Sequence, residues 1–192
     1  MTKEKTFITV LLLILALFLS GTSPLNSANR FQLEWELGSH AATENPFDRF
    51  PLLKLGFHHD FSRSFALGGS LAFTKWSDDL GMYGGAYTFS CYRPEIELAY
   101  LFPALLQDII NPFAGIGFGY HFYQIENELN NAYPGELKDH FFLTPFLGAN
   151  FAFGKKAAGI MKNIFMTVRL AWHVNGDFSG VRGSLGLGIR IN

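Results

Sequence analysis

Ten charged side chains occupy alternate positions in segments that are otherwise largely apolar, and their types and spacing make them the first candidates for chemistry. Five are basic and five are acidic: Lys54, Arg93, Arg169, Arg182 and Arg190, and Glu34, Glu36, Asp60, Glu95 and Glu97. Because side chains two residues apart on a strand project from the same side, Glu95 and Glu97 share one face. Enclosed charges of opposite sign are expected to pair, since an isolated buried charge is costly. The pattern predicts a network of structural ion pairs.

Histidines on the same face offer a second kind of chemistry. His40, His121, His140 and His173 fall on the alternation that the charged residues follow. Histidine is the commonest metal ligand, so a zinc or copper site is one interpretation. The four histidines lack the tight spacing that is typical of metal-binding motifs, and hydrogen bonding is the interpretation that we adopt. We therefore predict no metal site, no cofactor and no catalytic residue.

The elements that must position these residues are strands. Eight segments alternate between large apolar residues and small or polar ones, and turn-like clusters separate them. The segments are residues 30–40, 53–61, 65–75, 92–102, 111–122, 144–153, 164–174 and 182–192. Each is about the length that a tilted strand needs to cross a bilayer. The sequence predicts an all-β protein, an eight-stranded antiparallel up-and-down transmembrane β-barrel that follows an N-terminal signal peptide.

The volume of the side chains indicates which face lies inside. The apolar face carries roughly forty side chains, whereas the interior of an eight-stranded barrel is just wide enough for its own side chains to fill. The opposite face, as in "GIGFGYHF" from Gly115 to Phe122, is rich in small residues that fit this space. An apolar exterior of this size requires lipid to cover it. The alternative is a soluble two-sheet sandwich with the apolar residues in its core.

The chain of 192 residues divides into a predicted signal peptide, residues 1–28, and one predicted barrel domain, residues 29–192. The apolar run from Phe7 to Leu19 is shorter than the roughly 20 residues that a membrane-spanning helix needs, so we expect it to be removed. Cys91 is the only cysteine, and no intramolecular disulfide can form. The formal net charge of −1 offers no basic surface for nucleic acid. These features predict an exported protein that does not bind nucleic acid.

The signal, the number of strands, the "PFAGIGFGY" segment and the "GSLGLGIRI" ending resemble the small eight-stranded outer-membrane β-barrel family, which includes the transmembrane part of OmpA and OmpX. The resemblance covers the chain from about Arg30 to Asn192. It implies a location in the cell outer membrane, contact with outer-membrane lipids and insertion by the barrel assembly machinery. Such proteins often end on an aromatic residue that this machinery reads, and the ending Ile191, Asn192 departs from that pattern.

The predicted function is a structural or surface-interaction role with a salt-bridged, closed lumen. The polar segments "DDLGMYGGAY" and "NELNNAYPG" are the expected contacts for an extracellular ligand. A porin-like channel for small solutes is the first alternative, but a pore favours a wider lumen or a ring of one sign. The second is a lipid A hydrolase, because some barrels of this family use a His-x-Ser-Asn motif. Here "AWHVNGDFSG" has Asn175 where that motif needs serine.

Overall fold

The computed structural model describes residues 28–39, 51–77, 87–106, 108–127, 140–153, 159–174 and 180–191. Apart from Ala28, the predicted signal peptide lies outside these residues. The described part folds into eight strands and one short 3₁₀-helix: β1 (Ala28–Ser39), β2 (Leu52–Asp60), β3 (Phe65–Ser77), β4 (Tyr87–Leu101), β5 (Ile110–Asn127), β6 (His140–Ala152), η2 (Gly159–Asn163), β7 (Ile164–His173) and β8 (Gly180–Ile191). None of its helices is long and apolar enough to span a bilayer.

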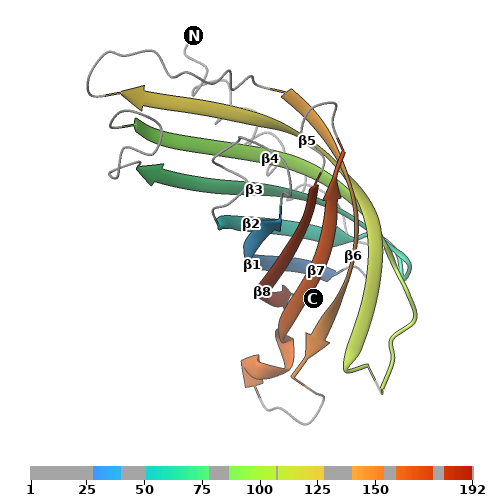
Figure 1. The fold of residues 1–192 in the computed structure, drawn as a ribbon. Coiled ribbons are helices and arrows are strands. Elements are labelled where there is room, and N and C mark those ends of the chain that lie inside the picture. The colour runs from blue at the N-terminus through green and yellow to red at the C-terminus, as the bar shows by residue number, and fades with distance from the viewer. Residues whose placement is uncertain are drawn as a thin grey trace.

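The strands close into one barrel in chain order (Figure 1). Every neighbouring pair is antiparallel, and β1 pairs with β8 from Asn29–Ile191 to Ser39–Val181. The predicted eight-stranded up-and-down barrel is therefore confirmed. Closure gives every strand two hydrogen-bonded neighbours, as a sheet surrounded by hydrocarbon requires.

The two ends of the barrel differ in which connections they carry. The end that we call the terminus end holds Ala28, Ile191 and the connections 61–64, 102–109 and 153–163. At this end Ser62 Oγ accepts hydrogen bonds from the backbone nitrogens of Ser64 and Phe65, at 3.2 and 2.9 Å, and tightens the β2–β3 turn. The opposite end, which we call the loop end, carries the connections 40–51, 78–86, 128–139 and 174–179, most of which lie outside the described residues.

The two faces of each strand have the orientation that the side-chain volumes predict. On the outward face Leu98 and Phe118 are 44% and 54% exposed. On the inward face Glu34 and Glu97 are fully buried, and Arg169 is 3% exposed. The large apolar side chains thus point away from the barrel axis, and the alternative of a soluble sandwich with an apolar core is wrong.

Strands β4 and β5 are longer than the sequence predicts. Segments 92–102 and 111–122 are expected, whereas the strands begin at Tyr87 and end at Asn127. In the extra part of β4 the apolar residues face inward, where Tyr87, Phe89 and Cys91 form a buried cluster with Tyr123 and Ile125 of β5. This reversal hides the strand from a pattern that expects apolar residues outside. It also marks where the apolar exterior of these two strands ends.

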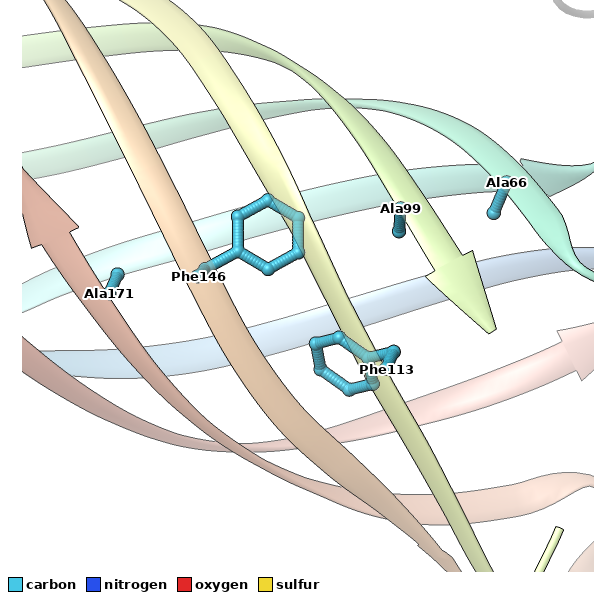
Figure 2. Close-up of a cluster of buried hydrophobic side chains, with 5 residues drawn as sticks. All are labelled: Ala66, Ala99, Phe113, Phe146 and Ala171. Carbon is cyan, nitrogen blue, oxygen red and sulfur yellow. The ribbon is translucent and has the colours of Figure 1, made fainter. Parts of the chain in front are cut away.

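The interior also contains more aromatic side chains than a lumen filled by small and charged residues would. Five phenylalanines are buried there: Phe89, Phe113, Phe142, Phe146 and Phe165. Phe113 and Phe146 form a cluster with Ala66, Ala99 and Ala171, and their rings meet edge to face with centroids 6.1 Å apart (Figure 2). Each of these two rings lies over a glycine of the neighbouring strand, so the glycines make room for phenyl groups.

Candidate functional site in the barrel lumen

The centre of the lumen is a cluster of buried charges from β2, β4 and β7. Lys54 Nζ lies 2.6 Å from Glu97 Oε1 and 3.3 Å from Glu95 Oε2. Arg169 Nη1 donates to Glu97 Oε2 at 2.7 Å, while its Nη2 lies 3.9 Å from Glu95 Oε1. Ser70 also donates to Glu97, at 3.1 Å. Glu97 is thus the acceptor on which this cluster converges.

A second ion-pair cluster lies nearer the loop end. Arg93 of β4 forms a bidentate pair with Glu36 of β1, with N–O distances of 2.8 and 2.5 Å. Two further cationic or ionisable groups approach the same carboxylate, Arg182 Nη1 at 3.5 Å and His173 Nε2 at 3.8 Å. The planar guanidinium matches the two carboxylate oxygens, which makes such a pair both strong and directional.

The remaining predicted residues lie toward the terminus end or between the clusters. Glu34 accepts a hydrogen bond of 2.5 Å from Ser184 Oγ. Asp60 pairs with Arg30, whose Nε and Nη2 donate to Asp60 Oδ1 at 3.0 and 2.6 Å. Arg190 faces the same end of the lumen, and no ion pair links it to a described residue. The structure therefore brings nine of the ten predicted charges into contact with polar partners.

Sequence reasoning missed two members of this network, Arg30 and His58. Arg30 pairs with Asp60, and His58 Nε2 lies 3.0 Å from Glu97 Oε2. Both side chains are inside the barrel, at 4% and 5% exposure. The alternation could have found them, since Arg30 is two residues before Gln32 and His58 is two residues before Asp60 on the inward face.

Three of the four predicted histidines gather in the loop-end half of the lumen. His121 Nδ1 and His140 Nε2 lie 2.9 Å apart, and the rings of His121 and His173 are 6.0 Å apart. His40 lies outside the described residues. Among residues that the structure describes, no group of three or more His, Cys, Asp or Glu side chains could hold a metal ion. The close pair is a histidine–histidine hydrogen bond, the role that the sequence analysis favours.

The arrangement around His173 bears on the hydrolase alternative. Its ring is buried inside the barrel, and Glu36, the carboxylate beside it, is already engaged by Arg93. A nucleophile would come from the segment after His173. Asn175, at the position of the motif serine, and Ser179 both lie outside the described residues. The described part of the site therefore supplies a buried histidine beside an acid that Arg93 already engages.

The charged clusters and the aromatic rings fill the middle of the barrel. Glu34, Arg93 and Arg169, which lie at this level, are each at most 3% exposed. The free volume beside Glu97 and Arg169 is about 10 Å³. A cavity of that size holds at most about one water molecule. In the described part of the chain the lumen is closed at mid-height.

The closed barrel, with apolar side chains outside and charged side chains inside, can be compared with solved structures. Ail, the attachment invasion locus protein of Yersinia pestis, matches with a TM-score of 0.56 and 13% identity over 86% of this chain and 97% of Ail. The N-terminal β-barrel domain of Pseudomonas aeruginosa OprF matches with a TM-score of 0.54 and 12% identity over 85% of this chain and 97% of that domain. No family model matches the chain, and no curated protein matches it in sequence.

The chain has the fold of the small eight-stranded outer-membrane β-barrels. Neisserial surface protein A, NspA, also matches in structure, with a TM-score of 0.50 and 10% identity over 86% of this chain and 96% of NspA. An outer-membrane barrel of this size accounts for both faces of the strands, because hydrocarbon covers the outside and side chains fill the inside. At such low identity the comparison supports the fold, whereas the site must be argued from this chain's own residues.

Proposed function

We propose that this protein is an integral outer-membrane barrel with a closed lumen and a structural or surface-interaction role. The observation that carries the proposal is the dense ion-pair network that blocks the lumen around Glu97 while the outward face stays apolar. A buried network of this kind fixes the positions of side chains on β1, β2, β4, β7 and β8 relative to one another. It stiffens a small barrel and leaves no continuous water-filled path through the described part.

We place the terminus end in the periplasm and the loop end outside the cell, with insertion by the barrel assembly machinery and lipids of the outer membrane around the barrel. The two longest connections, 40–51 and 128–139, then face the exterior, where a ligand would meet them. Segments 40–51, 78–86, 128–139 and 174–179 together carry eight acidic and two basic residues. This excess of negative charge favours cationic partners, because complementary charge speeds and orients association.

Ail provides a contrast in the charge of the ligand. Ail has been solved in complex with the heparin analogue sucrose octasulfate, a polyanion. The acidic connections of this chain would repel such a ligand. A surface-interaction role for this protein therefore calls for a ligand of the opposite charge, such as a lysine-rich peptide or a cationic surface.

A binding experiment tests the surface role. The full chain in nanodiscs is presented to immobilised poly-lysine peptide and to immobilised heparin, and binding is followed by biolayer interferometry at several salt concentrations. We expect salt-sensitive binding to poly-lysine and none to heparin. The variant Asp78→Asn/Asp79→Asn should bind poly-lysine more weakly, while Asp108→Asn, an exposed acid at the terminus end, should bind as the wild type does. Equal binding of heparin would contradict the proposal.

A conductance experiment tests the closed lumen against the porin-like alternative. The purified protein is inserted into planar bilayers after its folding has been checked by the change in gel mobility on boiling. We expect no stable openings on the nanosiemens scale, because the space beside Glu97 and Arg169 cannot hold a column of water. Regular openings of that size would overturn the closed-lumen proposal and favour passage of small solutes.

We also propose that the protein is not a hydrolase. The burial of His173 inside the barrel and the pairing of Glu36 with Arg93 support this, since neither group lies at the lipid-facing surface. Mass spectrometry of lipid A from cells that express the protein should find it unchanged. Loss of an acyl chain that depends on His173 would contradict this proposal.

A further inference from the structure

A cavity opens at the terminus end of the lumen, on the far side of the central charge cluster. Its volume is about 480 Å³, and we call it the terminus-end vestibule. The polar and charged side chains that line it and bear on its chemistry are Arg30, Asp60, Arg63, Asn111, Asn150 and Arg190. With three arginines and one aspartate, the vestibule carries an excess of positive charge that the centre of the lumen does not.

Asp60, the single carboxylate among the described residues of this lining, is already committed. Arg30 directs both Nε and Nη2 to Asp60 Oδ1, at 3.0 and 2.6 Å. Arg30 and Arg190 are register partners directly opposite each other on β1 and β8. Like charges in that position repel each other. The pairing of Arg30 with Asp60 therefore leaves the Arg190 guanidinium facing a neighbour of its own sign.

Two polar groups of the vestibule have no hydrogen-bond partner among the described residues. One is Arg190 Nε, which is buried. The other is Oδ1 of Asn150, whose side chain is 3% exposed. Oxygen and nitrogen of an asparagine amide exchange places on a flip of the group, so Asn150 is able to present either a donor or an acceptor to the cavity. A bound water or ion is one way in which buried groups of this kind are satisfied in proteins.

We propose that the terminus-end vestibule binds a small oxyanion, either free phosphate or the phosphate of a lipid head group, with Arg190 as its principal ligand. A guanidinium matches two oxygens of an oxyanion at once. The bound anion separates Arg190 from Arg30, and Arg63 at the mouth adds a second positive charge. This site lies at the opposite end from the surface that the proposed function uses, and it does not depend on that function.

The test follows the arginine side chains directly. The full chain is labelled with ¹⁵N-arginine and placed in a detergent without phosphate groups, and inorganic phosphate is titrated at constant ionic strength. We expect the Arg190 Nε–Hε signal, assigned by its loss in Arg190→Gln, to shift in a saturable way. Arg63→Gln should weaken phosphate binding about tenfold, as the loss of one charged hydrogen bond would. Lys162→Gln, which removes an exposed cation of η2 outside the vestibule, should leave it unchanged.

Thermal unfolding gives a second readout that remains valid if one variant folds poorly. Phosphate stabilises many proteins without binding them, so only a difference between variants counts. In chloride alone we expect Arg190→Gln to melt at or above the wild-type temperature, because it removes a charge that lies opposite Arg30 and that no described residue pairs. Adding phosphate should raise the melting temperature of the wild type more than that of Arg190→Gln. Equal gains in both would show a non-specific salt effect and overturn the proposal.

Nanodiscs distinguish the two sources of phosphate. If the lipid head group is the occupant, Arg190 signals in anionic phosphatidylglycerol discs should already be shifted and should respond little to added phosphate. If free phosphate is the occupant, the titration should look the same in those discs as in detergent. An Arg190 signal that moves neither with phosphate nor with lipid would overturn the proposal. That result is expected if the chain's own terminal carboxylate holds the guanidinium.

Discussion

The two sides of the lumen are filled in different ways. On one side, which we call the charged wall, side chains of β1, β2, β4 and β7 converge through ion pairs, with Glu97 at their centre. On the other side, which we call the aromatic wall, Phe113, Phe142 and Phe146 of β5 and β6 lie over glycines of adjacent strands. The walls meet where the Arg169 guanidinium lies 3.7 Å from the centroid of the Phe146 ring.

This barrel with an apolar exterior fills its interior by two kinds of complementarity. The charged wall depends on which donor reaches which acceptor, because unpaired charge in this space is costly. The aromatic wall depends on shape. A Cβ placed on Gly148 would lie 2.6 Å from Phe113 Cζ, closer than non-bonded carbon atoms approach. Substitutions on the two walls should therefore destabilise the barrel for different reasons.

The largest effect should come from breaking the charged wall at its centre. Glu97→Gln removes the charge that accepts from Lys54 at 2.6 Å and from Arg169 at 2.7 Å. Removing one partner of a buried ion pair costs about 3–5 kcal/mol, because the other is left uncompensated. Urea unfolding in lipid vesicles should measure this loss. The control Glu126→Gln alters an exposed acid of β5 and should cost under about 0.5 kcal/mol. Equal losses in the two variants would contradict the account of the charged wall.

Removing a ring from the aromatic wall should cost somewhat less. Phe146→Ala deletes the phenyl group that contacts Phe113 and the Arg169 guanidinium. The cost of such a cavity is about 3 kcal/mol, at the lower end of the usual range because water and Arg169 are able to occupy part of the space. The matched control is Phe118→Ala on the outward face, where lipid fills the gap. The same urea titration should find a loss at least twofold larger for Phe146→Ala, and a reversed order would contradict the role of shape in the lumen.

Much of this arrangement follows from the sequence because the side-chain period of a strand is two. Counting alternate positions assigns Lys54, Arg93 and Arg169 to the inside without any knowledge of strand pairing. The partner of each charge cannot be read in this way. Lys54 and Glu97 meet only because of the register that β2, β3 and β4 adopt in the closed barrel. Ten members of the network were therefore predicted from the sequence, whereas Arg30, His58 and the pairing of the charges were not.

The aromatic wall was hidden for a related reason. Phe146 and Gly115 are far apart in the sequence but are register partners on β6 and β5. A glycine next to apolar residues within one segment gives no sign that a ring from another strand covers it. The same limit concealed the inward cluster around Phe89, where the apolar residues change faces. Contacts between strands determine both features. The side-chain alternation within one strand carries no information about these contacts.

Adding volume to the aromatic wall should cost less than removing a ring. Gly148→Ala places a methyl group 2.5 Å from the Val168 carbonyl oxygen as well as against the Phe113 ring. Overpacking of this kind costs about 1–3 kcal/mol, because a strand or a ring must shift. Gly183→Ala is the matched control, since the nearest atom to its added Cβ is Leu170 Cδ2 at 3.8 Å. We expect the control to unfold within about 0.5 kcal/mol of the wild type in urea. A control as unstable as Gly148→Ala would point to the loss of glycine itself.

The smallest effect separates two explanations of the charged wall, net charge and specific contact. Glu34 and Glu97 are both fully buried acids, and replacing either with glutamine changes the charge of the lumen by the same amount. Their contacts differ, because Glu97 accepts from Lys54, Ser70 and Arg169. Glu34 accepts from Ser184, and its Oε1 has no hydrogen-bond partner among the residues that the structure describes.

If contacts decide, Glu34→Gln should cost about 1 kcal/mol or less, because the glutamine oxygen still accepts from Ser184. If net charge decides, its loss should equal that of Glu97→Gln in the same vesicle titration. Equal losses would replace our contact-based account of the charged wall with one based on the balance of charge in the lumen.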